Sequence, residues 1–512
     1  MAKALMIQGT GSGAGKSLIT AALCRIFRDR GINVAPFKAQ NMALNSFITR
    51  DGGEIGRAQA LQADAARIDP TVDMNPVLLK ASGEMGSQVV LRGKAHAHMT
   101  AREYYAFRKE AWDVVASSYD RLSRKHDLII MEGAGSPAEI NLADVDIVNM
   151  SAAKYAKAPV ILVGDIDKGG VFASLFGTVK LLGRDGRRIR AFIINKFRGD
   201  PEILGPGLSM IKAETGKPVI GVLPYIQAIG LPEEDGLGLQ ERSAAVGRYS
   251  TSGTVKIVVV RLKYISNFTD FDPLASEPGV EVVYTRDQAA IEHADMVIVP
   301  GSKNTVKDLL LLKEQGLDES IKRASAKKIP VMGMCGGYQM LGRKIFDPHG
   351  IESRHREVDG IGLLKIETVF QKEKTTCQVE AEINAEFGMR NAECKGNRTL
   401  KGYEIHMGTS TGDIGLFRVR RLVPDSAFRI PHSAFVLDGS ANGNCWGTYL
   451  HGIFDNDSFR RGIINFVRER KGLPRLTSTV KYAGLKERAL NRLAETVREN
   501  LDMKFIDWVI GL

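Results

Sequence analysis

The sequence predicts an α/β fold with two parallel-sheet domains followed by a helical tail. The chain has 512 residues, and this is about three times the length of an ordinary domain. Short apolar runs alternate with amphipathic stretches over the first 225 or so residues, which is typical of a parallel sheet covered by helices. A second series of the same kind follows residues 231–253, a stretch rich in Gly, Glu and Ser that indicates a linker.

Each predicted strand is one of these short apolar runs. In the first domain, residues 1–230, strands are expected at 4–8, 34–38, 128–132, 160–165, 191–195 and 219–224. In the second domain, residues 254–456, strands are expected at 255–261, 280–284, 296–300 and 330–334, and the pattern becomes richer in β-strand after Val358. Residues 457–512 have helical periodicity and predict the C-terminal tail.

Composition excludes several classes of protein. Hydrophobic residues make up 44% and charged residues 25% of the chain, which are ordinary values for a globular protein. No apolar stretch approaches the roughly 18 residues that a membrane span needs, and no export signal precedes the first glycines. The five cysteines are scattered, with no CxxC spacing, which argues against a disulfide framework or a zinc site. We therefore expect a cytoplasmic protein that does not contact membranes.

The net charge predicts an anionic partner. Lys and Arg number 70 against 59 Asp and Glu, giving +11, and such a field attracts anions. The denser basic patches, at 184–190, 418–421 and 460–471, lack the interleaved aromatic residues of a nucleic-acid site. A solvated surface or a small polyanionic substrate is favoured over nucleic acid.

A glycine-rich loop joins the first predicted strand to a helix expected at 18–30. Glycines in such a loop let consecutive backbone N–H groups wrap a phosphate, a lysine reaches the outer phosphates, and a serine hydroxyl binds magnesium. The residues predicted for these roles are Gly11, Gly13, Gly15, Lys16 and Ser17. The usual first glycine of this phosphate loop falls on Thr10, with Gly9 one place earlier.

Residues 9–14 also fit the dinucleotide fingerprint GxGxxA. A nicotinamide site wants an acid near the end of the second strand, to bind the ribose hydroxyls. That strand ends here in Lys38, a cation. A nucleoside triphosphate is therefore favoured over a dinucleotide, and a purely structural glycine turn remains as a third alternative.

Polar residues follow three more predicted strands. Glu132 ends the strand at 128–132, where a carboxylate can hold magnesium beside Ser17; capping a helix is its alternative role. Asp144 and Asp146 lie on one side of an extended stretch and are candidates for metal or substrate binding, or for a solvated face. Asn195, at the end of the strand at 191–195, is placed to read an adenine edge.

The segment 38–46 is dense in amides and follows the second strand. Its Lys38 and Asn41 suit a ligand that bears carboxylates or amides, and a polar loop without function is the alternative. Further cations at 75–80 and 89–94 suit a polyanionic substrate about as well as they suit solvent.

Cys335 stands between the strand at 330–334 and a helical pattern, followed by two glycines. A nucleophile on such a tight strand-to-helix turn is held exposed and strained, with the positive end of a helix beneath it. Cys335 is therefore predicted to be a nucleophile rather than a buried structural cysteine.

His451 ends a late apolar strand and is the predicted base. Gly301 and Ser302 follow the strand at 296–300, where a backbone N–H can help to form an oxyanion hole. Glu404 and His406 are both candidates for the group that orients His451, and the sequence does not choose between them.

A series of motifs runs in order over nearly the whole chain: QGTGSGAGKS, KAQNMALNS, NPVLLK, MEGAGSPAEINL with DVD, GMCGGYQMLG, GYEIHMG and GTYLHGIF. With these motifs the chain resembles the cobyric acid synthase family of CobB/CobQ-type glutamine amidotransferases. The resemblance implies a dethiobiotin-synthetase-like phosphate-loop domain joined to a class I amidotransferase domain. Class I amidotransferases commonly carry HxE at the base, but Gly452 and Ile453 follow His451, so the resemblance implies a Cys-His dyad.

The resemblance also implies an activity. The family uses ATP, Mg²⁺ and L-glutamine to amidate the b, d, e and g side-chain carboxylates of adenosylcobyrinic acid a,c-diamide during cobalamin biosynthesis. Within the same class, cobyrinic acid a,c-diamide synthase is the nearest alternative. A phosphate-loop switch ATPase with an inert second domain is the alternative from another class, but it leaves Cys335 and His451 as coincidence. Oligomeric state is not predicted.

Overall fold

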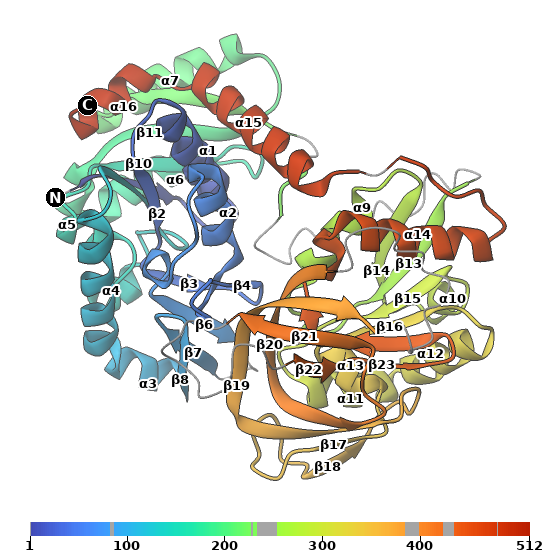
Figure 1. Cartoon of the computed structure of the whole chain (residues 1–512). Coiled ribbons are helices and arrows are strands. Elements are labelled where there is room, and N and C mark those ends of the chain that lie inside the picture. Colours follow the sequence, from blue (N-terminus) through green and yellow to red (C-terminus); the bar gives the residue numbers. More distant parts are fainter. Residues whose placement is uncertain are drawn as a thin grey trace.

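The computed structural model describes residues 2–81, 86–226, 229–232, 253–384, 399–422, 435–478 and 480–512, which form two lobes (Figure 1). Most of the predicted linker at 231–253 lies outside these residues. Both lobes are built on mainly parallel sheets, as the sequence predicts, and the predicted α/β fold class is confirmed.

The first lobe is centred on a parallel sheet of six strands in the order β12-β11-β10-β1-β9-β2. Their bounds are β1 (Lys3–Gly9), β2 (Val34–Phe37), β9 (Leu128–Glu132), β10 (Val160–Asp165), β11 (Ile189–Phe197) and β12 (Val219–Pro224). All six strands overlap the predicted ranges. A strand that is buried on both faces has a continuous apolar sequence, and for this reason these strands could be predicted.

Helices cover both faces of this sheet. Alternate residues of β1 point to opposite sides, so that Leu5 and Ile7 join one core while Ala4 and Met6 join the other. The helices of the first lobe are α1 (Lys16–Asp29), α2 (Arg57–Ala66), α3 (Ala101–Ala106), α4 (Arg108–Ser123), α5 (Met150–Tyr155), α6 (Val171–Leu181) and α7 (Pro201–Thr215), with 3-10 turns η1 (Val72–Met74), η2 (Ile140–Val145) and η3 (Asp185–Arg188).

Two small sheets interrupt the first lobe between β2 and β9 and were not predicted. One has the order β3-β6-β7-β8, and the other is the hairpin β4-β5. Their bounds are β3 (Gln40–Met42), β4 (Ser46–Ile48), β5 (Glu54–Gly56), β6 (Val77–Ala81), β7 (Ser87–Leu91) and β8 (Lys94–Met99). In Figure 1 they lie at the end of the first lobe that faces the second.

The second lobe contains a mainly parallel sheet in the order β14-β13-β15-β16-β24-β23. Its strands are β13 (Val255–Val260), β14 (Val280–Thr285), β15 (Met296–Val299), β16 (Val331–Met334), β23 (Ser440–Asn442) and β24 (Cys445–Thr448). Its helices are α9 (Asp272–Ala275), α10 (Gln288–Glu292), α11 (Thr305–Glu314), α12 (Leu317–Ala326), α13 (Gly336–Leu341) and α14 (Asp457–Arg470), with 3-10 turns η4 (Phe268–Phe271) and η5 (Ile453–Asp455).

A second, largely antiparallel sheet in this lobe accounts for the β-rich pattern after Val358. It is dominated by the long pair β19 (Ile366–Ile383) and β20 (Thr399–Gly412). The other strands are β17 (Lys344–Phe346), β18 (Glu357–Asp359), β21 (Phe417–Leu422), β22 (Phe435–Asp438) and β25 (Leu450–His451). The β20–β25 pairing places Tyr403 opposite His451 and thereby brings this sheet to one candidate site.

The predicted tail at 457–512 is helical but is divided between the two lobes. Helix α14 packs into the core of the second lobe through Phe459, Ile463 and Val467. The last helices, α15 (Tyr482–Asn500) and α16 (Met503–Ile510), cross to the first lobe, where α15 lies beside α1 (Figure 1). The two domains are therefore linked twice along the chain. Among the described residues, no helix combines the length and apolarity needed to cross a membrane.

Candidate active sites

The glycine-rich loop lies where the sequence predicts it, between β1 and α1. Gly13 and Gly15 have φ of 72° and 96°, which favour glycine. The Nζ atom of Lys16 donates to the carbonyl oxygens of Gly11, at 2.8 Å, and Gly135, at 3.0 Å. Lys16 therefore bridges the loop and the segment that follows β9, which is the position expected of a lysine that serves bound phosphates.

Glu132 lies at the carboxyl end of β9 and is 1% exposed. Its Oε1 atom accepts hydrogen bonds from Ser17 Oγ at 2.8 Å and Lys38 Nζ at 2.9 Å, while Oε2 accepts from Gln62 Nε2 at 2.6 Å. Burial opposes ionisation, but Lys38 and these hydrogen bonds outweigh it and hold the pKa of Glu132 below its ordinary value. The structure therefore places an ionised carboxylate next to the Ser17 hydroxyl.

A hydroxyl and a carboxylate are the hard oxygen donors that Mg²⁺ prefers. Ser17 and Glu132 fit the metal in this respect, because their oxygens lie 2.8 Å apart. Within the described ranges, no group of three or more His, Cys, Asp and Glu side chains is arranged to hold a metal ion. Magnesium at this position would therefore take further ligands from a phosphate of the nucleotide, as is usual for nucleotide-bound Mg²⁺.

Lys38, Asn41 and Asn195 all contact protein groups. Lys38 pairs with Glu132. Asn41 donates to Gln59 Oε1 at 3.0 Å. Asn195 donates to the carbonyl oxygen of Ala14 at 2.9 Å and abuts Gly15, where a Cβ would collide with it. Their predicted roles toward substrate or adenine stay predictions, and Asn195 also supports the loop.

The carboxylate of Asp146 accepts hydrogen bonds from the backbone at the start of α5. Its carboxylate accepts backbone hydrogen bonds from Val148, Asn149 and Ser151, at 2.8 to 3.0 Å. These bonds satisfy N–H groups that a helix start leaves without partners. Its predicted role in substrate binding stays a prediction, and Asp144 is exposed.

Cys335 occupies the predicted strand-to-helix turn between β16 and α13. Its backbone has φ of 51° and ψ of −110°, a strained conformation for a residue with a side chain. Its N–H donates to the carbonyl oxygen of Thr448 at 2.9 Å, which ties the turn to the end of β24. At Gly337 a Cβ would collide with the carbonyl of Val299, so the turn requires glycine there. The cysteine is thus fixed in the geometry of a nucleophile elbow.

His451 is fully buried beside Cys335, and its orienting partner is Asp270. The Nδ1 atom of His451 lies 2.6 Å from Asp270 Oδ2, and Asp270 Oδ1 accepts from the N–H of Gly452 at 3.0 Å. Burial lowers the pKa of His451, but Asp270 and the neighbouring Cys335 outweigh it and raise the pKa to about 10. The imidazole that Asp270 orients therefore lies beside Cys335, in the position of the base that a cysteine nucleophile requires.

Neither Glu404 nor His406 orients His451. Glu404 pairs with Arg421 at 2.6 Å, and His406 Nε2 lies 3.4 Å from Glu404 Oε1. Sequence reasoning missed Asp270, which follows the carboxyl end of β13 in the polar and aromatic segment 264–271. Its position beyond the end of a predicted parallel strand was the available signal, because His451 and Cys335 lie beyond the same edge of the sheet.

The predicted oxyanion segment also reaches this site. A Cβ on Gly336 would lie 3.0 Å from the backbone N of Ser302, and one on Gly301 would lie 3.6 Å from His451 Cε1. Ser302 is held in place by its hydroxyl, which donates to Asp308 Oδ2 at 2.6 Å. A backbone N–H beside the elbow is the donor that an oxyanion hole requires.

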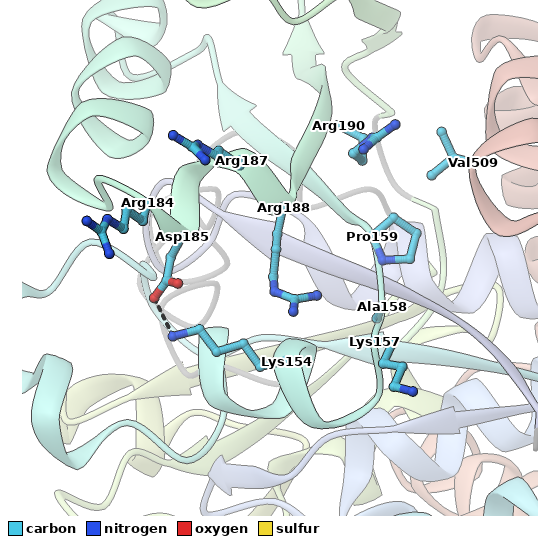
Figure 2. Close-up of a pocket in the computed structure, with 10 residues that line it drawn as sticks. All are labelled: Lys154, Lys157, Ala158, Pro159, Arg184, Asp185, Arg187, Arg188, Arg190 and Val509. Carbon is cyan, nitrogen blue, oxygen red and sulfur yellow. Dashed lines mark ion pairs between the residues drawn. The ribbon is translucent and has the colours of Figure 1, made fainter.

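A cluster of cations lies away from both sites, around a pocket of about 560 Å³ (Figure 2). The cations that line it are Lys154, Lys157, Arg184, Arg187, Arg188 and Arg190. The only acid in the lining is Asp185, which pairs with Lys154 at 2.6 Å. The pocket adjoins the starts of β10 and β11, whereas the glycine-rich loop follows the end of β1, at the opposite edge of the sheet. This part of the positive charge therefore does not serve the candidate sites by contact.

Two family models match the two lobes. Residues 5–239 match a CobQ/CobB/MinD/ParA nucleotide binding domain. Residues 256–459 match a CobB/CobQ-like glutamine amidotransferase domain. The first match covers the glycine-rich loop and Glu132, and the second covers Cys335, His451 and Asp270.

Curated relatives match over the full length of the chain. The cobyric acid synthase of Thermodesulfovibrio yellowstonii is 49% identical over 512 residues, which covers 100% of both chains. That of Syntrophobacter fumaroxidans is 46% identical, covering 100% of this chain and 99% of the relative. That of Caldanaerobacter subterraneus subsp. tengcongensis is 48% identical, covering 99% and 98% respectively.

Proposed function

The chain belongs to the cobyric acid synthase family, and from this membership we propose that it is a glutamine-hydrolysing ligase of cobalamin biosynthesis. It converts the b, d, e and g side-chain carboxylates of adenosylcobyrinic acid a,c-diamide to amides and so forms adenosylcobyric acid. ATP activates each carboxylate, and L-glutamine supplies the nitrogen.

The observation that carries this proposal is the presence of two chemically complementary sites in one chain. One combines Lys16, Ser17 and Glu132 around a glycine-rich loop, and the other aligns Asp270 with His451 beside Cys335. A switch ATPase would need only the first. Cobyrinic acid a,c-diamide synthase would need both, but the full-length relatives described above are cobyric acid synthases.

In the glutaminase half, Cys335 attacks the side-chain amide of glutamine. The carbonyl oxygen gains negative charge, which the backbone N–H of Ser302 is placed to stabilise. His451 gives its proton to the departing ammonia, and a glutamyl thioester remains on Cys335. Water, deprotonated by His451, then releases glutamate. Asp270 holds the imidazole in one orientation throughout and stabilises its protonated form.

In the synthetase half, a substrate carboxylate must be activated because oxide is too poor a leaving group for attack by ammonia. Transfer of the terminal phosphate of ATP gives an acyl phosphate, and ammonia displaces that phosphate. Lys16 and the N–H groups of the loop neutralise the transferring phosphate, which is the main task of a protein in this chemistry. Mg²⁺, held by Ser17 and Glu132, would supply further positive charge to the phosphate oxygens.

The remaining predicted residues are assigned to ligands in the same proposal. Lys38 and Asn41 face the corrinoid carboxylates, Asp146 orients the substrate, and Asn195 supports the adenine side of the loop. Support for Lys38 is its position beside the candidate metal ligand Glu132, where a substrate carboxylate would meet the transferring phosphate.

Mass spectrometry of the corrinoid product tests the whole proposal. The protein is incubated with adenosylcobyrinic acid a,c-diamide, ATP, Mg²⁺ and glutamine, with isotopically labelled amide nitrogen. We expect four labelled amides per product. A parallel incubation supplies cobyrinic acid instead. Two labelled amides on cobyrinic acid, with none on the a,c-diamide, would identify the a,c-diamide synthase. ATP hydrolysis without any amide on either substrate would favour the switch ATPase.

A further inference from the structure

Two hydrogen bonds from the first lobe hold the segment that carries Asp270. The Oδ1 atom of Asn45 accepts from the backbone N–H of Phe268 at 3.1 Å. The backbone N–H of Ser46 donates to Asn267 Oδ1 at 2.8 Å. All four residues are buried, so neither bond is easily replaced by water.

The segment 267–270 is a tight turn whose shape decides where the Asp270 carboxylate points. Asn267 has φ of 52°, in the left-handed region, and its carbonyl oxygen accepts from the N–H of Asp270 at 3.0 Å. The turn is held by this internal bond, by Asn45 and Ser46 of the first lobe, and by the Tyr284 hydroxyl, which donates to the carbonyl oxygen of Phe268 at 3.1 Å. We expect loss of the first-lobe contacts to move Asp270 relative to His451.

Tyr403 of β20 contacts His451 from a second side and is itself bonded to the first lobe. Tyr403 stacks on the His451 ring, with centroids 5.2 Å apart, and its hydroxyl donates to the carbonyl oxygen of Ser46 at 3.4 Å. The N–H of Arg57 donates to the carbonyl oxygen of Asn45 at 3.1 Å. Burial opposes the charge of Arg57, but Tyr403, Asp455 and Asp270 outweigh it and raise its pKa. First-lobe residues therefore contact the turn that carries Asp270 and the Tyr403 ring that packs on His451, and Arg57 adds a positive charge near Asp270.

The turn of the hairpin is also anchored to the second lobe. Thr376 Oγ1 donates to the carbonyl oxygen of Gly52 at 2.8 Å. Ile48 packs with Tyr403 and Ile405 in a small separate core. In Figure 1, β4 lies against the second lobe, beside the sheet that contains β20. The Asn45 contact is therefore one of several contacts between the β4-β5 hairpin region and the second lobe.

We propose that Asn45 is a positioning residue of the glutaminase site: it belongs to the synthetase lobe, and it holds the Asp270 turn so that the carboxylate meets His451. The inference rests on the proposed function, because it assigns Asn45 to the glutamine-hydrolysing half. If Asn45 has this role, the glutaminase site depends on the first lobe for the geometry of the Asp270–His451 contact, and not only for the use of its ammonia.

Asn45→Ala in the full chain tests the proposal, with glutamine hydrolysis and ammonium-driven amidation measured separately. We expect kcat for glutamine hydrolysis to fall about 10-fold, the loss expected when one buried hydrogen bond no longer supports the transition state. KM for glutamine should stay unchanged, since Asn45 does not touch that substrate, and ammonium-driven amidation should keep the parental rate.

The pH profile supplies a readout that a purely structural role would not move. The groups that face His451 are Asp270, Cys335 and Tyr403, with Arg57 behind Asp270. If the Asp270 contact loosens, the pKa of His451 falls, and the alkaline limb of glutaminase activity moves to lower pH. Asn267→Gly, which removes the second bond but keeps the left-handed backbone, should shift the limb in the same direction.

Arg50→Gln is the matched control. Arg50 lies in the turn of the β4-β5 hairpin, its side chain is 80% exposed, and it pairs with Asp69 at 2.9 Å. It should leave every measurement at the parental value. An Asn45→Ala protein with parental kcat and pH profile would overturn the proposal, and so would equal loss with glutamine and with ammonium. Parental protein without any glutaminase activity would instead refute the proposed function.

Discussion

Asp270 and His451 are 181 residues apart in the sequence, yet their side chains meet at 2.6 Å between Oδ2 and Nδ1. The contact is buried on both sides, and the second carboxylate oxygen is held by the N–H of Gly452. The family resemblance implied a Cys-His dyad, but this chain places a carboxylate where a Cys-His-Asp triad needs it.

Asp270→Asn should lower kcat for glutamine hydrolysis by roughly 10³-fold, because the amide neither stabilises the imidazolium nor selects the same tautomer. The pKa of His451, about 10 in the parental protein, should fall, so the alkaline limb of the pH profile moves to lower pH. Glutamate release measured across pH checks both effects. Asp287→Asn, an exposed helix cap in the same domain, should behave as the parental protein, and parental activity in Asp270→Asn would leave only a dyad.

Cys335→Ala should stop glutamine-driven amidation, because no other group near the elbow can form the thioester. The synthetase half keeps Lys16, Ser17 and Glu132, so a high concentration of ammonium at mildly alkaline pH should restore amidation. Rates with glutamine and with ammonium chloride are compared at matched ionic strength, since binding of an anionic substrate is salt-sensitive. Cys445→Ala, which alters another buried cysteine, should retain glutamine use. Glutamine use at the parental rate by Cys335→Ala would refute the assignment of the nucleophile.

Lys16→Ala and Glu132→Ala should abolish amidation with either nitrogen source, by about 10³-fold or more, because both serve the phosphate and its metal. Product formation is followed by mass spectrometry. Arg187→Ala is the control: it removes the same charge as Lys16→Ala, but from the pocket of Figure 2 at the opposite edge of the sheet. If Arg187→Ala matched Lys16→Ala, the general positive field and not the loop would be responsible.

Much of the fold could be predicted because buried parallel strands leave a local signature. Residues 128–131 and 160–163 are uninterrupted apolar runs, and they form most of β9 and β10. The hairpin β4-β5 escaped prediction because each strand has only three residues, and its polar Ser46 and Glu54 are buried only through contacts with distant segments.

The site residues also differ in whether a local sequence signal could predict them. Lys16, Ser17 and Cys335 lie in contiguous motifs whose spacing is itself the signal. Asp270 has no such motif, and its role depends on how β13 and β24 are ordered in the sheet. Lys38 was proposed for substrate binding from its place in the amide-rich segment after the second strand, and that role stays a prediction. Its contact with Glu132 was not predicted, because it depends on the adjacency of β2 and β9.

A buried ion cluster joins the lobes beside the Asp270 turn, and it makes a prediction about stability. The Glu54 carboxylate accepts from Lys80 of the first lobe at 2.6 Å and from Lys374 of the second lobe at 2.5 Å. Burial would raise the pKa of Glu54, but Lys374 and Lys80 outweigh it and bring the pKa far below the ordinary value. Burial lowers the pKa of Lys80, and the charge of Glu54 opposes that shift. Glu54 is therefore the ionised centre of the cluster.

Glu54→Gln should lower the free energy of unfolding at pH 7 by about 3 kcal/mol or more, because removing one partner of a buried ion pair leaves the other charge uncompensated. The free energy of unfolding of the parental protein should also depend on pH. A carboxyl whose pKa is depressed by folding contributes its full stabilisation above its unfolded pKa, about 4.3, and loses it as pH falls toward the folded value. Stability should therefore decline below about pH 4.3 in the parental protein and decline less steeply in Glu54→Gln. Urea unfolding followed by circular dichroism, at pH 7 and at several pH values below about 4.3, measures this difference. Glu319→Gln, which breaks an exposed pair with Lys322, should change neither quantity, since exposed pairs contribute little. Equal slopes in the parental protein and Glu54→Gln would mean that the cluster does not hold the lobes together through this charge.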